Sequence, residues 1–365
     1  MISRLFDILS RRIDGPLMVA VVLSVALGLT VVYSASGAGS LDRVLGQARN
    51  VAIALAALWI VANTPPQTLM RLAVPLYIGG MVLLVGVALF GDVRNGARRW
   101  LNLGFTAIQP SEIMKIAVPL AMAWYFHRHE EALRLRNYAV AAILLALPVG
   151  LVVRQPDLGT ALLIFASGFF VIFLAGLSWK VIVTLVTAGL VSLPFLWTTL
   201  HDYQRQRILT LLDPTEDPLG AGYHIIQATI AIGSGGVLGK GWLNGTQAQL
   251  DFVPERSTDF ILAVFGEEFG LAGNLLLLTL YLLIIARGLF IAANASTTFS
   301  RLSAGAITLT FFTYAFVNIG MVSGLLPVVG VPLPMVSYGG TALVSILVGF
   351  GVLMSISTHK QLVSS

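Results

Sequence analysis

Long apolar stretches recur along the chain, and shorter polar segments separate them. A helix needs about 20 mostly apolar residues to cross a bilayer. Ten stretches come close to or exceed that length, and they run over residues 16–37, 47–63, 70–91, 110–127, 137–154, 157–176, 179–200, 258–292, 302–326 and 336–358. The pattern predicts an all-α, polytopic integral membrane protein with about ten transmembrane helices. We expect one transmembrane domain over residues 1–365, with the first stretch an uncleaved anchor because it is longer than a signal-peptide core.

The longest polar segment, residues 201–257, lies between the seventh and eighth predicted helices. Connections beyond about 15 residues in a compact protein are usually functional or disordered. Residues 223–232 are apolar enough to form an amphipathic or re-entrant helix, which argues against disorder. We therefore expect a large, structured extracytoplasmic loop.

Composition strengthens the membrane interpretation. Hydrophobic residues make up 57% of the 365 positions and charged residues only 11%, whereas soluble domains carry roughly 25% charged residues. An ordinary soluble enzyme, a disordered chain and a fibrous repeat are excluded. The net charge of +5 comes without a basic run, so nucleic-acid binding is not expected. The chain has no cysteine, which excludes disulfides and thiolate metal sites.

The basic residues give the orientation and a first functional hint. Arg4, Arg11 and Arg12 precede the first span and favour a cytoplasmic start, and ten crossings then place both termini in the cytoplasm. Over the whole chain, however, Lys and Arg divide almost evenly between the two sides. The external ones crowd segments 92–109 and 201–257, where guanidinium groups suit a phosphate-bearing ligand; a solvated loop balanced by nearby aspartates is the alternative. The candidate anion-binding residues are Arg98, Arg99, Arg205, Arg207 and Lys240.

Ionisable residues inside spans are costly and are functional candidates by default. Glu112 and Lys115 lie three positions apart on one helix face, so they form either a structural ion pair or part of a site. Asp157 and Asp259 open the sixth and eighth spans. Either aspartate alone could simply complement a helix dipole, with Ser257 or Thr258 as the N-cap before Asp259.

The predicted topology brings these acids together. Glu112, Asp157 and Asp259 all open even-numbered spans, which start on the outer side if the N-terminus is cytoplasmic. Carboxylates for proton transfer and arginines for an anion would then share one membrane face, as a phosphate-linked substrate requires. Glu267 and Glu268 lie deeper in the eighth span. On a regular helix Glu267 projects about 80° from Asp259 and Glu268 nearly opposite, and a structural role, a polar cavity and a proton relay all stay open for them.

Several segments, in order along nearly the whole chain, carry a family resemblance. They are Asn95-Gly96-Ala97-Arg98-Arg99-Trp100, Gln109-Pro110-Ser111-Glu112 with Lys115, Gln155-Pro156-Asp157-Leu158-Gly159-Thr160, Gly220-Ala221-Gly222-Tyr223-His224, Pro254-Glu255-Arg256 with Thr258-Asp259-Phe260-Ile261, and Pro332-Leu333-Pro334 with Ser337-Tyr338-Gly339-Gly340. The chain resembles the SEDS family (shape, elongation, division and sporulation). Pro254-Glu255-Arg256 resembles the elongation-specific members more than the division-specific ones. Ser257 departs from the family, which commonly has histidine there.

The resemblance implies a peptidoglycan glycosyltransferase that polymerises lipid II during cell elongation and releases undecaprenyl pyrophosphate. It places the enzyme in the bacterial inner (cytoplasmic) membrane, with the active site facing the periplasm. Asp259 matches the family's essential acid and is expected to be the general base of an inverting transfer. Glu112, Lys115 and Asp157 match positions of the family's central polar cavity. The implied partners are a class B penicillin-binding protein (a transpeptidase), MreC and MreD, and a divalent cation (Mg or Mn) is a possible cofactor.

Two other classes of function stay open. A lipid II flippase needs a polar path to the inner side, and the charges here gather at the outer face; Glu267 and Glu268 are the main evidence in its favour. An ion-coupled transporter of a polyprenyl-linked substrate would show inverted repeats and broken helices in matching halves, and no convincing repeat is present.

Overall fold

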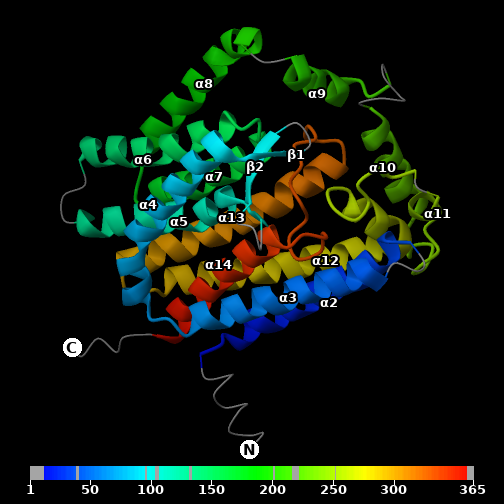
Figure 1. Ribbon diagram of the computed structural model, residues 1–365, viewed down its shortest axis with the longest axis horizontal. Coiled ribbons are helices and arrows are strands. Elements are labelled where there is room, and N and C mark those ends of the chain that lie inside the picture. Colours follow the sequence, from blue (N-terminus) through cyan, green and yellow to red (C-terminus); the bar gives the residue numbers. More distant parts are fainter. Residues whose placement is uncertain are drawn as a thin grey trace, which may run out of the picture.

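The computed structural model describes residues 12–37, 41–94, 97–102, 107–130, 134–199, 202–215, 222–250 and 252–359. Long helices packed side by side make up most of the molecule (Figure 1). The first half of the chain contains α2 (Gly15–Ala35), α3 (Leu41–Ala62), α4 (Pro66–Phe90), β1 (Asp92–Arg94), β2 (Ala97–Asn102), β3 (Ala107–Ile108), α5 (Pro110–Arg128), α6 (Leu135–Val153), α7 (Leu158–Leu174) and α8 (Trp179–Thr199). The second half contains α9 (Asp202–Leu212), α10 (Tyr223–Ser234), α11 (Thr246–Gln249), α12 (Ile261–Ala293), α13 (Thr298–Val322) and α14 (Thr341–Thr358).

Seven of the described helices are long and apolar enough to cross a membrane. They are α2, α3, α4, α6, α12, α13 and α14. The chain is therefore a multi-pass helical membrane protein, as the apolar pattern predicts. The prediction of an all-α chain needs one addition, because β1, β2 and β3 form a small antiparallel sheet between α4 and α5.

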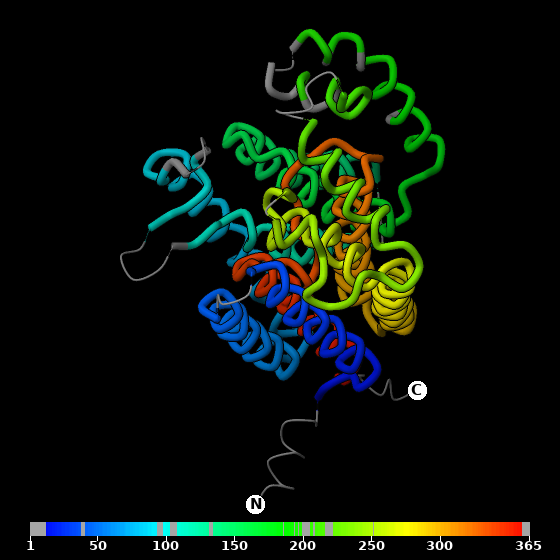
Figure 2. Tube along the Cα trace, turned by 90° about the vertical axis from the view of Figure 1, so that its right-hand side faces the viewer, coloured from blue at the N-terminus to red at the C-terminus, as the bar shows by residue number. Residues whose placement is uncertain are grey.

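The core is built around α13, the most deeply buried of the seven spans. It packs against α12, α7, α5 and α14, while α2 covers α12 and α3 covers α14. Figure 2 shows α2 and α3 in blue beside the red α14, although these segments are far apart in the sequence. By contrast, α8 and α9 stand off from the rest of the bundle (Figure 1), and no described side chain of α8 is buried.

Asp14 joins the two ends of the chain at one end of the bundle. It caps α2, accepting from the Leu17 amide at 3.2 Å, and it receives a bidentate pair of bonds from Arg287 at 2.9 and 2.7 Å. The Ser357 hydroxyl, at the end of α14, donates to the same carboxylate at 2.7 Å. Burial raises the pKa of Asp14, but these donors outweigh it and bring the pKa below its usual value. The start of α2 and the end of α14 therefore lie on the same side.

Replacing Asp14 with alanine should destabilise the fold without touching the opposite end of the bundle. The change removes an N-cap and leaves Arg287 without its partner, which together should lower the free energy of unfolding by about 2–4 kcal/mol. Thermal unfolding of the detergent-solubilised protein measures the loss. An Asp42→Asn variant, altered at an exposed acid of α3, is the control. Equal melting temperatures for the two variants would contradict a stabilising role for the hydrogen bonds of Asp14.

The eighth predicted span is not one regular helix. Gly270 adopts φ 63° and ψ −160° inside α12, and a Cβ there would lie 2.3 Å from the Gly239 nitrogen. The preceding loop supplies hydrogen bonds at this break: Lys240 N and Gly241 N donate to the carbonyls of Glu267 and Glu268, both at 3.0 Å. Irregular backbone at membrane depth is tolerated where protein satisfies it in this way. Glu267 and Glu268 precede this break, whereas Asp259 precedes Ile261, the first residue of α12, so the angles that a regular helix predicts between Asp259 and the two glutamates do not apply.

Two helices next to the predicted site start later than their apolar stretches. Helix α12 begins at Ile261 rather than 258, and α14 begins at Thr341 rather than 336. Phe260 is the N-cap residue of α12 and makes no side-chain capping bond, so the expected cap by Ser257 or Thr258 is wrong. Asp259 lies in a turn before the helix because the backbone there is bonded to another segment, described below.

Candidate functional site

The connector between α13 and α14, residues 323–340, brings the predicted acids to one end of the bundle. A Cβ on Gly159, in the first turn of α7, would lie 2.5 Å from the Val329 oxygen, so the start of α7 lies against the connector. A Cβ on Gly330, which has φ +72°, would lie 3.5 Å from an Asp259 carboxylate oxygen. Helix α14 follows directly and contacts α5. The turns that carry Asp157 and Asp259 therefore lie beside one connector, and Glu112 lies on the helix that contacts α14, the next element.

Asp259 is half-buried, between the buried Phe260 and Ser257. Its neighbourhood includes His224 of α10, whose ring centroid lies 5.5 Å from that of Phe260. Burial lowers the pKa of His224, and the nearby carboxylate of Glu255 opposes this only in part. The Asp259 carboxylate lies beside Gly330, which has no side chain.

Glu112 and Lys115 form a buried polar cluster on α5. The Lys115 ammonium donates to Glu112 at 2.7 Å and to the Tyr314 hydroxyl of α13 at 2.5 Å. The Ser345 hydroxyl of α14 donates to the other Glu112 oxygen at 2.7 Å. The ion-pair interpretation of this sequence motif is confirmed, and the cluster ties three helices together.

A cavity of about 520 Å³ opens beside this cluster. Its walls come from α3, α4, α5 and α14 and are largely apolar, while Glu112, Ser345 and Asn50 supply polar groups. Ligand cavities commonly combine apolar walls with a few polar groups that orient the ligand. The cavity therefore suits a ligand with an apolar tail and a polar head.

Asp157 is the N-cap of α7 and accepts from the Thr160 amide at 3.2 Å, so its carboxylate lies at the positive end of the helix dipole. It also faces Arg99 of β2, with 3.4 Å between the Arg99 Nε and the carboxylate. A second guanidinium nitrogen of Arg99 donates to the Pro156 carbonyl at 2.9 Å. The small sheet is thereby fixed to the start of α7.

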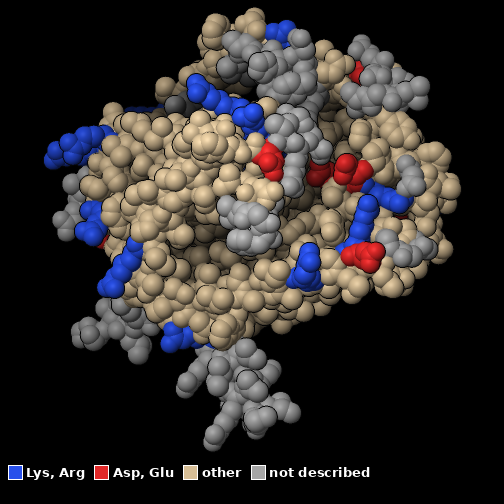
Figure 3. All heavy atoms as spheres, in the orientation of Figure 1, with Lys and Arg blue, Asp and Glu red and all other residues tan. Residues whose placement is uncertain are grey.

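The other candidate cations are placed differently from one another. Arg98, the neighbour of Arg99 on β2, has an exposed side chain. Arg205 of α9 donates to the last carbonyls of α8, at 3.0 Å to Trp197 and 2.8 Å to Thr198. The side chain of Arg207 lies outside the described residues. In Figure 3 most of the visible acidic atoms lie right of centre, toward the end where β1 and α11 are labelled in Figure 1.

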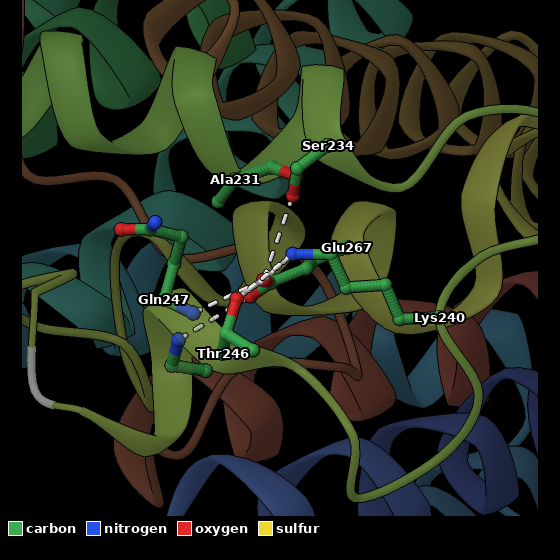
Figure 4. A network of polar contacts seen from close by, with 7 residues as sticks. Ala231, Ser234, Lys240, Thr246, Gln247 and Glu267 are labelled. Carbon is green, nitrogen blue, oxygen red and sulfur yellow. Dashed lines mark hydrogen bonds and ion pairs between the residues drawn. The ribbon is translucent and has the colours of Figure 1, made fainter.

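Lys240 lies in a separate cluster (Figure 4). The sequence predicts anion binding for it, but its ammonium donates to the fully buried Glu267 at 2.7 Å and to Thr246 at 2.8 Å. Glu267 also accepts from the Gln247 amide at 3.0 Å. This network holds the loop before α12 against the helix, so we assign Lys240 and Glu267 a structural role.

Sequence reasoning missed the residues that hold these groups in place. Tyr314 and Ser345 bind the Glu112–Lys115 pair, and Gln47 bonds to the connector at Ser337 and Gly339, each at 3.2 Å. The available signal was a polar side chain inside an otherwise apolar stretch. Its partners could not be read from the sequence, because they lie about 200 to 290 residues away.

A resident metal site is not evident in the part of the chain that the structure describes. No group of three or more His, Cys, Asp or Glu side chains there is placed to hold a metal ion.

Comparison with known proteins decides the family. A family model described as "Cell cycle protein", which covers FtsW, RodA and SpoVE, matches residues 16–362. The chain belongs to the FtsW/RodA/SpoVE family. This agrees with the SEDS resemblance of the sequence motifs.

Relatives within the family support this along the whole length. "Peptidoglycan glycosyltransferase MrdB" of Escherichia coli K12 is 53% identical over 97% of this chain and 95% of its own. "Probable peptidoglycan glycosyltransferase FtsW" of Geobacter metallireducens is 34% identical, covering 96% of each chain.

Solved structures of the FtsW/RodA/SpoVE family share the fold. One, described as "Structural coordination of polymerization and crosslinking by a peptidoglycan synthase complex", has a TM-score of 0.82 at 34% identity, over 96% of this chain and 99% of that one. The rod shape determining protein RodA of Thermus thermophilus has a TM-score of 0.73 at 29% identity, over 96% and 98%.

Proposed function

We propose that the site around connector 323–340 joins lipid II units into glycan strands during cell elongation. The chain is a peptidoglycan glycosyltransferase. The observation that carries this is the meeting of Asp259, the Asp157–Arg99 pair and an apolar cavity at one end of a chain 53% identical to a peptidoglycan glycosyltransferase.

The proposed reaction is an inverting displacement. The 4-hydroxyl of the acceptor GlcNAc attacks the anomeric carbon of the donor MurNAc, and the bond from that carbon to the phosphate oxygen breaks. Asp259 accepts the hydroxyl proton as general base. Undecaprenyl pyrophosphate leaves with the electron pair, so the donor itself supplies the driving force and no nucleotide is needed.

Cations beside the sheet are proposed to stabilise the leaving group. The primary candidates for the pyrophosphate are Arg98, which is exposed, and Arg99, which pairs with Asp157. Arg205 and Arg207 of α9 are further candidates. A Mg or Mn ion held chiefly by the pyrophosphate stays a prediction, and no step depends on it. The apolar cavity beside Glu112 suits part of a polyprenyl tail, with the Glu112–Lys115 cluster shaping its polar end.

We infer ten crossings, with both termini in the cytoplasm and the site facing the periplasm. Helices α5, α7 and α8 add three crossings to the seven apolar spans, because each links neighbouring spans and has 17 to 21 residues. The Asp14–Ser357 bond supports an even number, since it holds the start of α2 and the end of α14 on one side. The segment 201–257 then forms the large periplasmic loop, within a single domain of the bacterial inner membrane.

A class B penicillin-binding protein is the proposed partner, since a structural relative at 34% identity is described as coordinating polymerisation and crosslinking. MreC and MreD are proposed as further members of the complex.

The purified chain, incubated with labelled lipid II, should form glycan polymer, and more of it with the transpeptidase present. Absence of polymer in both reactions, with lipid II moved across a vesicle membrane instead, would favour the flippase alternative. Its main support is weakened here because Lys240 pairs with Glu267.

Replacing Arg98 with alanine should weaken donor use. A charge-assisted bond to phosphate at an exposed site contributes about 1–2 kcal/mol, so kcat/KM for the lipid-linked donor should fall roughly 5- to 30-fold through a higher KM. Steady-state kinetics with donor varied at saturating acceptor measures this. Arg43→Ala, which removes an exposed arginine from α3, is the matched control. An unchanged donor KM in the Arg98 variant would remove this residue from the anion site.

A further inference from the structure

Two buried side chains hold the backbone of the turn that carries Asp259. The carbonyl oxygens of Ser257, Thr258 and Asp259 each accept a hydrogen bond from elsewhere in the chain. Their donors are the Tyr338 amide at 2.8 Å, the Ser337 hydroxyl at 2.6 Å and the Asn318 side-chain amide at 2.9 Å, respectively. Three successive carbonyls are thus held from α13 and from connector 323–340.

Asn318 and Ser337 each bridge the turn and the connector. Asn318 is fully buried in α13, and its second amide hydrogen goes to the Val331 carbonyl at 2.7 Å. Ser337 is 5% exposed, and its hydroxyl also accepts from the Leu333 amide at 2.7 Å. Turning the Asn318 amide over would set its oxygen against two carbonyls, so the network fixes the orientation of this amide.

The connector itself is anchored from a third direction. The Tyr281 hydroxyl of α12 donates to the Pro334 carbonyl at 2.6 Å, and Tyr281 is 1% exposed. Gly330, whose position faces the Asp259 carboxylate, immediately precedes the residue that Asn318 holds. The same bonds therefore set both the backbone of Asp259 and the wall beside its carboxylate.

We propose that Asn318 and Ser337 are positioning residues that hold the Asp259 carboxylate in its reactive place. This rests on the proposed role of Asp259 as general base. Asp259 precedes the first residue of α12, so the helix does not fix its backbone. A shift of about 1 Å in a reacting group lowers rates by about 100-fold. The hydrogen bonds of Asn318 and Ser337, which we call the clamp, supply the fixed geometry that the helix does not.

The test compares kcat and KM in variants of the full-length protein. Ser337→Ala removes the bridging hydroxyl, and Asn318→Leu removes both donors at similar volume. Ser167→Ala is the matched control, because Ser167 is also fully buried but bonds only within its own helix, to Ile164 at 2.8 Å. We expect kcat for lipid II polymerisation to fall at least 10-fold for Ser337→Ala and about 100-fold for Asn318→Leu. The KM for lipid II should stay within twofold, and Ser167→Ala should keep wild-type kcat.

Melting temperature and a reference variant separate the outcomes. A kcat that stays within threefold of wild type in Ser337→Ala would overturn the clamp, as would a loss that appears only as a higher KM or only in proportion to unfolded protein. Ser337→Ala is the milder change and decides the question if Asn318→Leu does not fold. Asp259→Asn is measured alongside: if it stays active, the general-base assignment fails, whereas an inactive Asp259→Asn beside a fully active Ser337→Ala refutes the clamp alone.

Discussion

Replacing Asp259 with asparagine should abolish glycan polymerisation while the protein still inserts and folds. Asparagine keeps the shape of the side chain but cannot accept the proton of the attacking hydroxyl. General-base catalysis contributes about 10²- to 10⁴-fold, so the rate should fall by at least 100-fold. Asp259→Ala should behave alike, since Asp259 is only half-buried.

The measurement is the rate at which purified protein converts labelled lipid II into polymer, resolved on a gel. Asp42→Asn, which neutralises an exposed acid of α3, is the charge-matched control and should retain wild-type activity. Binding of the lipid-linked substrate should persist in the Asp259 variants. Normal polymer from Asp259→Asn would refute the general-base assignment.

The apolar pattern was sufficient to predict the helices, because lipid demands long runs of apolar residues whatever their neighbours. Seven of the predicted spans meet that demand in the structure by length and composition. The helix ends were less predictable where another segment takes the backbone bonds. At Ser257 to Asp259 the carbonyls bind Asn318, Ser337 and Tyr338, so α12 starts later than its apolar run.

The candidate site was predictable to a similar extent. Counting crossings predicts Glu112, Asp157 and Asp259 on one face, because alternate spans start on the same side, and in the structure connector 323–340 lies against Gly159 of α7 and beside Asp259. Partner choice was not predictable: Lys115 is bonded to Tyr314, 199 residues on, as well as to its neighbour Glu112. Lys240 shows the same limit. Its charge alone predicts anion binding, but in the structure its ammonium pairs with the buried Glu267.

Removing Glu267 should unfold the loop before α12. Its carboxylate accepts from Lys240, Thr246 and the amides of Gln247 and Ala248, the last at 3.3 Å (Figure 4). Glu267→Ala leaves these four donors, and the Ser234 hydroxyl at 3.5 Å, without this acceptor. Removing one partner of a buried ion pair costs about 3–5 kcal/mol. A lower melting temperature in detergent and faster proteolysis within residues 236–250 should report the loss.

The order of stability among single variants distinguishes a structural role of Glu267, which holds the loop before α12, from a proton relay. Lys240→Met removes one donor but leaves Glu267 with Thr246 and two backbone amides, so it should destabilise the protein less than Glu267→Ala does. The loop also bonds to the backbone of α12 on both sides of Gly270, so its release should disturb the helix that follows Asp259 and reduce polymerisation. A proton relay differs in the melting temperature: Glu267→Ala would keep the wild-type value and lose only activity.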